Sequence, residues 1–259
     1  MSEIITRRSL LAGAGAGAGL LLSGCDSVIH NPDVLKYIYK ENEAHYFLQR
    51  GLSSYASLAP EYRPDQMSPV FRANGSLNPG TPQYSAWVAD KFASYRLKIY
   101  GMVNKPLELS IAQIRSMPAR TQITKHDCVE GWTAVGQWHG PTVGSLLKLA
   151  NVQSKAKYVV FHCADHYHGA ALPYYESLDM FNAFHPQTIL AWEMNGSPVS
   201  VPHGAPLRLR AERHLGYKQA KYVIGMELVE DFSHIQGGHG GYWQDNVDYD
   251  WFAGICSRT

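Results

Sequence analysis

Cys128 lies in a stretch whose residue types could do chemistry, because charged and polar side chains surround its sulfur. Residues 121–132 read Thr-Gln-Ile-Thr-Lys-His-Asp-Cys-Val-Glu-Gly-Trp. A thiolate is a soft ligand for transition metals and a strong nucleophile, and Gly131 allows a tight turn or the close approach of a bulky group. An isolated cysteine can equally be a buried structural residue, so the rest of the chain must decide between the two.

A second stretch, residues 201–221, is rich in cations. It sets one acid, Glu212, against five basic residues, Arg208, Arg210, Arg213, Lys218 and Lys221. Basic side chains and the backbone N–H groups exposed at Gly204 and Gly216 would together suit an anion such as phosphate. The alternative is a solvated strand face that carries ordinary surface charge.

A third cluster could bind a metal of its own. It holds His162, Cys163, Asp165, His166 and His168. Zinc or copper there would make the protein a non-catalytic metal-binding lipoprotein, but the spacing matches none of the common structural zinc patterns. A surface histidine run is the usual explanation for such a cluster.

The N-terminus resembles a bacterial export signal. Arg7 and Arg8 precede 13 apolar or small residues at 10–22, a run shorter than the ~20 residues that span a bilayer. The arginine pair resembles a twin-arginine signal, and Leu-Ser-Gly-Cys ending at Cys25 resembles a lipobox. We expect cleavage after residue 24 and a lipid on Cys25. With Asp26 next, we expect anchoring on the periplasmic side of the bacterial inner membrane.

Composition places the chain among globular proteins. Hydrophobic residues make up 45% and aromatic residues 12%, and the net charge of +1 gives no general attraction to nucleic acid. The length is enough to bury a full core. If Cys25 is lipidated, three of the four cysteines remain, and an odd number in an oxidising compartment leaves at least one for another role.

Hydrophobic patterns predict the elements that position these residues. Alternation or β-rich runs predict strands at 95–100, 157–163, 189–193, 207–211 and 222–229, and helices are expected at 109–116, 143–150 and 176–184. Loop chemistry predicts a loop at 71–86 and a turn at 138–141. We therefore expect one α+β domain with a mixed sheet at 71–259, preceded by a tether and arm at 25–70.

Three motifs in order resemble the sulfite-oxidase superfamily of molybdopterin enzymes, nearest to its small bacterial members. They are Cys-Val-Glu-Gly-Trp at 128–132, Ala-Trp-Glu-Met-Asn-Gly at 191–196 with His-Gly-Ala-Pro-Leu-Arg at 203–208, and Gly-Tyr-Lys-Gln-Ala-Lys at 216–221. The resemblance covers residues 71–230. It implies a sulfite-oxidase-type molybdopterin-binding fold and a molybdenum-molybdopterin cofactor.

Near the metal, the resemblance assigns four positions. Cys128 would be the protein thiolate on molybdenum, and Asn74 would hydrogen-bond the pterin. Cys163 falls where the family places a small polar residue beside the pterin, with Asp165 close by.

Five further positions would form the rest of the cofactor pocket. His203 and Arg208 would bind the pterin and its phosphate. Lys218, Gln219 and Lys221 would complete the pocket through backbone and side chain. The phosphate matches the anion site that the basic stretch indicates on its own chemistry.

This chain departs from the animal and plant sulfite oxidases beside the ligand cysteine. Those enzymes carry arginines there for the anionic substrate, whereas this chain has Thr133 and Ala134, with Glu130 close to the metal. Cys128 and Glu130 are the candidate catalytic residues. We expect oxygen-atom transfer to reduce a small S- or N-oxide; sulfite oxidation by the same cofactor is the alternative.

The end of the chain bears on partners. The immunoglobulin-like dimerisation domain of those enzymes is missing after the last expected strand, so we expect a monomer. No haem-attachment Cys-x-x-Cys-His occurs, so electrons are expected from a separate redox partner, a haem protein or a quinol-linked membrane protein. The aromatic, glycine-rich tail at 237–243, with Trp251, could cap the pocket; we expect it to finish the core.

Overall fold

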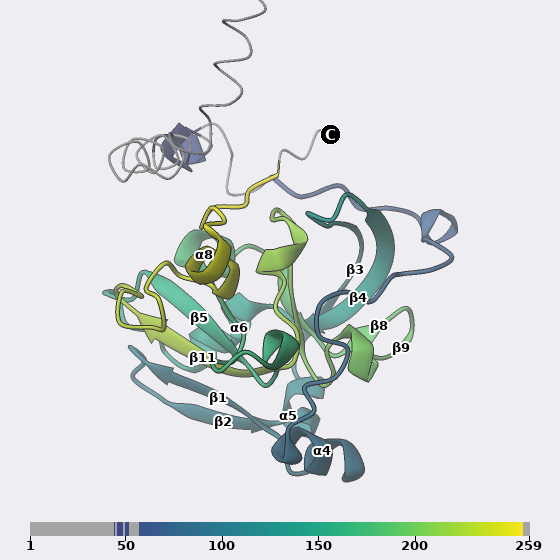
Figure 1. Cartoon of the computed structure of the whole chain (residues 1–259), viewed down its shortest axis with the longest axis horizontal. Helices are drawn as coiled ribbons and strands as arrows, with labels where there is room; N and C mark the ends of the chain where they lie inside the picture. The colour runs from purple at the N-terminus through teal and green to yellow at the C-terminus, as the bar shows by residue number, and fades with distance from the viewer. Residues whose placement is uncertain (1–43, 45, 49, 52–56, 256–259) are drawn as a thin grey trace, which may run out of the picture. The chain divides into compact units, whose positions relative to one another are not determined.

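The computed structural model describes residues 44, 46–48, 50–51 and 57–255 (Figure 1). The chain divides into two compact units, Met1–Ser53 and Ser54–Thr259. In the first unit the described residues are helical, and the Arg50 guanidinium lies over the Tyr46 ring at 4.9 Å. None of the helices in the described ranges has the length and apolar character to cross a bilayer. The arginine pair and Cys25, which carry the export and lipid predictions, lie outside these ranges.

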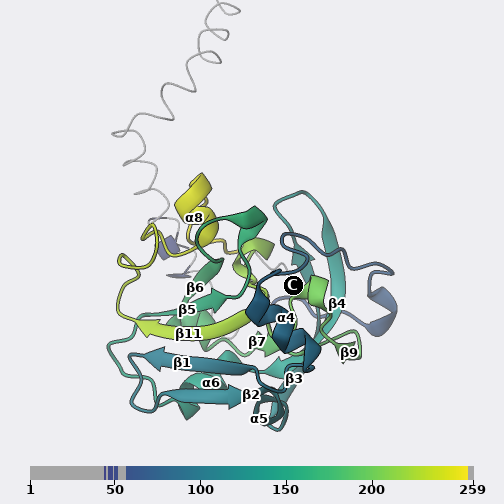
Figure 2. The ribbon, with the colours of Figure 1, turned by 60° about the horizontal axis from the view of Figure 1, so that its bottom comes forward.

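A five-stranded mixed sheet is the largest sheet of the second unit. Its order is β2 (Leu107–Ser110), β1 (Arg96–Gly101), β11 (Val223–Val229), β5 (Tyr158–Cys163) and β6 (Tyr175–Asp179), as Figure 2 shows. Strands β1 and β11 run parallel and the other neighbours antiparallel. Side chains alternate between the two faces of a strand, so β1 buries Leu97 and Ile99 and exposes Lys98. The predicted α+β class with a mixed sheet is confirmed.

A long hairpin dominates the remaining strands. Strands β3 (Ala119–Asp127) and β4 (Thr133–Pro141) pair in register from Ala119 opposite Pro141 to Asp127 opposite Thr133. Two short strands extend this sheet, β8 (Glu193–Met194) and β9 (Ser197–Pro198), and β7 (Thr188–Ala191) pairs separately with β10 (Arg208–Ala211). The predicted turn at 138–141 is wrong, because Trp138 lies inside β4, fully buried and paired with both β3 and β8.

Side-chain caps define where several helices begin. The Thr142 hydroxyl accepts from the Ser145 N–H at 3.2 Å before α6 (Val143–Leu149), and Ser110 and Gln113 form a capping box at α5 (Ile111–Arg115). The described part of the chain adds α4 (Pro82–Ala89), α7 (Met180–Ala183) and α8 (Tyr242–Val247). Single 3-10 turns occur at η1 (Pro64–Gln66), η2 (Tyr167–Gly169), η3 (Val201–His203) and η4 (Gly216–Lys218).

Two further predictions need correction. The expected helix at 176–184 begins as strand β6, because residues 175–179 pair with β5 and are all buried; only then does Asp179 cap the short helix α7. Pairing with a sheet partner outweighs weak helix propensity there. The expected loop at 71–86 is cut short by α4, which starts at Pro82 with Thr81 as its cap.

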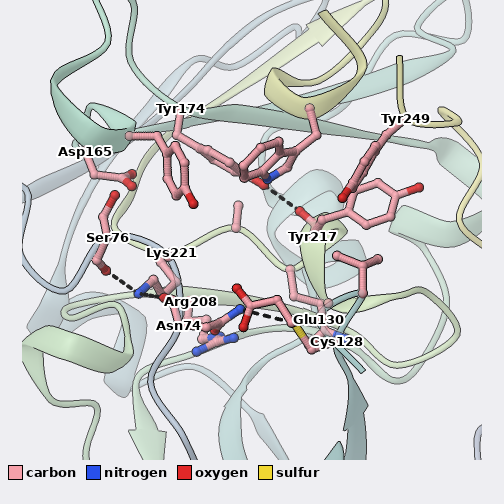
Figure 3. A pocket seen from close by; sticks show the side chains of 17 residues that line it. Asn74, Ser76, Cys128, Glu130, Asp165, Tyr174, Arg208, Tyr217, Lys221 and Tyr249 are labelled. Carbon is pink, nitrogen blue, oxygen red and sulfur yellow. Dashed lines mark hydrogen bonds between the residues drawn. The ribbon is translucent and has the colours of Figure 1, made fainter. Parts of the chain in front are cut away.

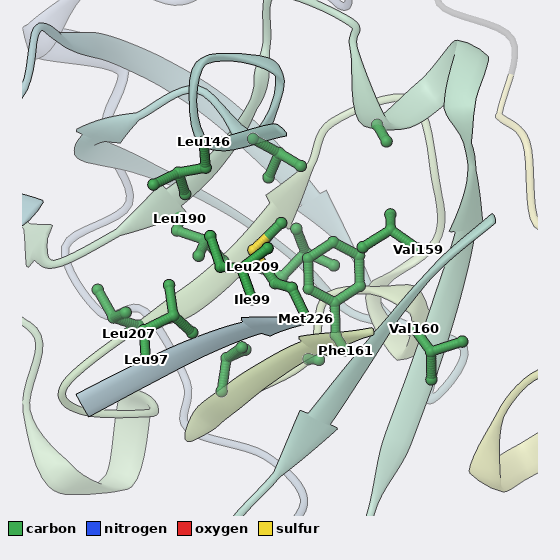
Figure 4. Close-up of a cluster of buried hydrophobic side chains, with 14 of the residues drawn as sticks. Leu97, Ile99, Leu146, Val159, Val160, Phe161, Leu190, Leu207, Leu209 and Met226 are labelled. Carbon is green, nitrogen blue, oxygen red and sulfur yellow. The ribbon is translucent and has the colours of Figure 1, made fainter. Parts of the chain in front are cut away.

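The main core lies between the five-stranded sheet and the elements packed on it. Leu97, Phe161, Leu209 and Met226 come from different strands, meet Leu146 of α6 and are fully shielded from solvent (Figure 4). Removing such a side chain to Ala typically costs about 2–5 kcal/mol. A second, smaller cluster around Phe71 and Trp138 packs under the β3–β4 hairpin. These cores hold the hairpin and β10 in place.

Candidate active site

One cavity collects residues from six separate segments. It encloses about 720 Å³ of atom-free space, counting its open mouth. The segments are residues 74–76, the hairpin loop at 128–130, the segment at 165–174, Arg208 of β10, residues 216–221 and residues 243–249 (Figure 3). The fold therefore brings parts of all three motifs together in one cavity.

Cys128 lies in the loop that joins β3 to β4. The loop is closed by two backbone hydrogen bonds, from the Cys128 N–H to the Trp132 carbonyl at 3.0 Å and from the Gly131 N–H to the Cys128 carbonyl at 3.1 Å. Gly131 adopts a φ of 83°, which favours glycine. The Asn74 amide nitrogen approaches the Cys128 sulfur at 3.6 Å. Burial raises the pKa of the Cys128 thiol, so a cationic ligand is needed to hold the thiolate near neutral pH.

Arg208 supplies a buried cation without a carboxylate partner in the described part of the chain. Its side chain is 1% exposed, donates to the His203 carbonyl at 3.1 Å and packs over Trp138 at 5.2 Å, while its Nε has no hydrogen-bond partner among the described residues. Burial, helped by the neighbouring Arg210, lowers the pKa of Arg208 to about 9. A buried cation of this kind is costly unless an anion meets it, so the cavity is suited to a phosphate.

Lys221 and Asp165 occupy the side of the cavity next to the 74–76 loop. The Lys221 ammonium donates to the carbonyls of Asn74 at 2.7 Å, Pro202 at 2.9 Å and Ser76. Burial lowers the pKa of Lys221 to about 7 and raises the pKa of Asp165. Lys221 therefore holds the Asn74 loop in position, and Asp165 adds a buried carboxyl that can receive N–H groups of a ligand.

Three predicted cofactor residues do not line the cavity. The Lys218 ammonium lies 2.6 Å from Glu176, and both side chains are buried. Cys163 is buried in the main core, with its sulfur 3.9 Å from the Phe161 carbonyl. The His203 ring bonds the Phe71 carbonyl at 3.0 Å, so it reaches the cavity only through its own carbonyl, which accepts from Arg208.

Gln219 lines the cavity, but both the oxygen and the nitrogen of its side-chain amide contact residues beneath the cavity. Its oxygen lies 3.2 Å from the His126 ring, and its nitrogen donates to the His214 carbonyl at 3.2 Å. A backbone contact from this segment thus fits the predicted role better than a side-chain contact.

The alternative of a solvated basic face at 201–221 is wrong. Arg210 is fully buried and bonds Glu212 at 2.6 Å, and Arg213 packs over the Phe181 ring at 5.5 Å. Neither lines the cavity. The strand predicted at 207–211 does not have the expected exposed face. All five residues are buried, because β10 is covered on both faces.

The histidine-rich cluster does not form a metal site in the described residues. His162 bonds Glu227 at 2.8 Å, and within the described ranges no group of three or more His, Cys, Asp or Glu side chains is arranged to hold a metal ion. The zinc or copper alternative therefore has no structural support.

An aromatic side of the cavity was not predicted. Its members are Tyr167, Tyr174, Tyr217, Trp243 and Tyr249. Tyr217 lies within the third motif, and Trp243 belongs to the tail that was expected to finish the core. Trp251 packs away from the cavity, on Phe232 and Tyr158. Trp243 packs against the main core, as predicted, but it also lines the cavity. The aromatic richness of the tail was the available signal.

The residues present fit a molybdenum-molybdopterin group. Cys128 offers the soft sulfur ligand, and Arg208 offers the phosphate a buried cation that no carboxylate of the described residues pairs with. Asn74, Asp165 and the backbone at Gln219 and Lys221 offer polar contacts between these two points.

Comparisons with known proteins agree with this fit. Residues 85–235 match the family described as oxidoreductase molybdopterin binding domain. A protein of Azospira oryzae, provisionally named protein-methionine-sulfoxide reductase subunit YedZ1, is 30% identical over 97% of this chain and 89% of its own length. The protein-methionine-sulfoxide reductase catalytic subunit MsrP of Xanthomonas campestris is 35% identical over 54% of this chain and 46% of its own length.

Among solved structures, the sulfane dehydrogenase SoxCD of Paracoccus pantotrophus aligns with a TM-score of 0.49 and 23% identity, over 54% of this chain and 39% of that one. The family match covers the strands, the basic stretch and the cysteine loop that build the cavity. The chain belongs to the oxidoreductase molybdopterin binding domain family of the sulfite oxidase superfamily, and it is an oxidoreductase with a molybdenum-molybdopterin cofactor.

Proposed function

We propose that the protein reduces an S-oxide, with methionine sulfoxide as the substrate class. The observation that carries this is the charge of the cavity. Its two cations are accounted for, since Lys221 is held by three carbonyls and Arg208 faces the proposed phosphate position. The exposed Glu130 carboxylate stands near Cys128 instead. A sulfite dianion would meet like charge there, at a cost of several kcal/mol, whereas a sulfoxide is neutral.

The names of the relatives support this substrate class. The Azospira and Xanthomonas proteins are both named for protein-methionine-sulfoxide reduction. Arg210 and Arg213, which could have restored an anion site, are engaged elsewhere.

The proposed roles follow from the positions of the side chains. Cys128 would bind the metal and Arg208 the phosphate, with Asn74 and Asp165 on the pterin. When bound, the cofactor supplies a metal that can accept an oxygen atom and be returned to its reduced form by two electrons. Burial of Arg208 and its carbonyl bond to His203 keep the guanidinium in one orientation, which lowers the entropy lost on binding.

Glu130 is the proposed proton donor at the mouth of the cavity. Reduction of a sulfoxide takes up two protons and two electrons and releases the sulfide and one water. The Trp132 indole N–H donates to Glu130 at 3.0 Å and so holds this carboxylate in place, while its exposure lets it exchange protons with solvent.

We further propose that a separate protein supplies the electrons. A haem protein or a quinol-linked membrane protein would fit, and the Azospira relative is itself named as a subunit. Anchoring through Cys25 on the periplasmic side of the inner membrane would keep the enzyme beside such a partner.

The deciding experiment measures steady-state rates with natively exported protein whose molybdenum content has been determined. We expect a reduced dye to drive turnover of methionine sulfoxide, with little oxidation of sulfite in the presence of an acceptor dye. Cys128→Ser serves as the inactive control. Fast, saturable sulfite oxidation without sulfoxide turnover would overturn the proposal.

A further inference from the structure

The segment at 242–249, distant in sequence from every motif, builds one wall of the cavity. Trp243 and Tyr249 both line it, and their rings stack at 5.7 Å with an angle of 25°. Tyr217 meets Tyr249 at 5.1 Å, and Tyr167 meets Trp243 at 4.8 Å. These four side chains, the aromatic wall, form a continuous surface of rings.

Buried polar contacts hold this segment down. Gln244 is 2% exposed, and in the amide orientation that satisfies both neighbours it donates to Glu176 and accepts from Lys218, each at 3.1 Å. The Asp245 carboxylate accepts from the Tyr175 hydroxyl at 2.5 Å and from the Gly237 N–H at 2.9 Å. The aromatic wall is therefore fixed before any substrate arrives.

The left-handed backbone conformation of Asp248 sets the direction of the Tyr249 ring. Asp248 has a φ of 54° at the end of α8, and the Tyr249 N–H bonds back to the Trp243 carbonyl at 3.4 Å. This turn folds the chain back, so that Tyr249 packs on Trp243 instead of extending away from the cavity.

The opposite side of the cavity is polar. Figure 3 shows Tyr217 and Tyr249 on one side, and Arg208, Glu130 and Cys128 on the other. A sulfoxide has the same two-sided character, because its oxygen is negative while the sulfur and the attached carbons are positive. Aromatic faces are negative and attract sulfur and polarised C–H groups, so the organic substituents suit the aromatic wall.

We propose that Trp243 and Tyr249 determine substrate specificity by binding the organic substituents of the S-oxide. The inference rests on the proposed function. It selects S-oxides with extended apolar substituents over the smallest ones, because a larger substituent covers more of the two stacked rings.

The test compares methyl phenyl sulfoxide with dimethyl sulfoxide in fully loaded enzyme. In Trp243→Ala we expect the KM for methyl phenyl sulfoxide to rise about tenfold, as loss of an aromatic contact and its buried area predicts. The KM for dimethyl sulfoxide, the kcat for both and the molybdenum content should change little. Tyr249→Ala, in the segment after α8, should shift the same ratio in the same direction and provides the test should Trp243→Ala fail to fold.

Trp251→Ala is the matched control, since Trp251 lies in the same tail but packs on Phe232. It should leave the ratio of the two KM values at the wild-type value. An unchanged ratio in Trp243→Ala and Tyr249→Ala, or loss of molybdenum from both, would overturn the inference and assign the wall to structure or to the cofactor. A loaded wild-type enzyme that reduces neither sulfoxide would overturn the proposed function, and this inference with it.

Discussion

Replacing Lys218 with Met separates the two roles that the sequence and the fold assign to this residue. The motif resemblance places Lys218 in the cofactor pocket, whereas the structure buries its ammonium 2.6 Å from Glu176. Met keeps most of the length of the side chain and removes the charge, which leaves Glu176 buried without its cation. Breaking a buried ion pair from one side costs about 3–5 kcal/mol, and each 1 kcal/mol shifts the midpoint by roughly 2–4 °C at this size. We expect the thermal midpoint to fall by about 6–20 °C.

The stability lost in Lys218→Met should grow with pH. Burial raises the pKa of Glu176 from 4.5 to about 7, and Lys218 opposes that rise. Without Lys218 the folded-state pKa of Glu176 rises further above the unfolded value. A group with a raised folded-state pKa stabilises the fold below its unfolded pKa, and the stabilisation is lost as pH rises through the folded pKa. The deficit of Lys218→Met should therefore be small near pH 5 and large near pH 8.

The assay follows thermal unfolding by near-UV circular dichroism at both pH values, with metal analysis of the same samples. Adding Glu176→Gln to Lys218→Met should recover most of the stability, because the second change removes the unpaired charge. Lys157→Met is the matched control, since its ion pair with Glu230 at 3.2 Å is exposed and worth about 0–1 kcal/mol. Wild-type stability of Lys218→Met at the higher pH, together with loss of molybdenum from both the single and the double variant, would refute the structural role.

Three other predictions address the ligand, the phosphate and the membrane. Cys128→Ser should keep the fold by circular dichroism, abolish turnover and change the molybdenum(V) resonance, because a hard oxygen replaces a soft sulfur; an active variant would exclude Cys128 as the ligand. Arg208→Met should fold and lose most of its molybdenum cofactor on metal analysis, because the buried cation for the phosphate is gone; full retention would contradict that assignment. Cys25→Ala should release the protein from membranes on fractionation, and changing Arg7 and Arg8 to Lys should block export. Soluble periplasmic protein from the unchanged gene would contradict the lipid anchor.

Hydrophobic patterns predicted the elements whose burial is decided locally. Strands β5 and β11 and helix α6 all appear within about a residue of the predicted ends, because their apolar spacing matches the side they bury. Two of the errors, at 138–141 and 176–184, occur where pairing with distant strands overrides turn and helix signals. Neither β3–β4 nor the start of β6 had a strong pattern of its own.

The motifs located part of the cavity. Asn74, Cys128 and Arg208 meet as the resemblance implied. Residue type alone does not show which way a side chain points, and Lys218 and Lys221 illustrate this. Three positions apart, one is paired with Glu176 in the interior and the other clamps the Asn74 loop.

The sequence by itself determined the chemistry: a soft sulfur in a polar loop, a stretch of cations suited to a phosphate, and strands and helices of an α+β domain. These features are encoded in residue type and short spacing, so they are readable before folding. Only the tertiary structure decided that Arg208 has no carboxylate partner among the described residues, that Trp243 lines the same cavity as Cys128, and that Tyr249 lies across this cavity from Cys128. The physical reason is that ion pairing, burial and ring packing join residues far apart in the chain, and their partners are settled only when the sheets and the tail pack together.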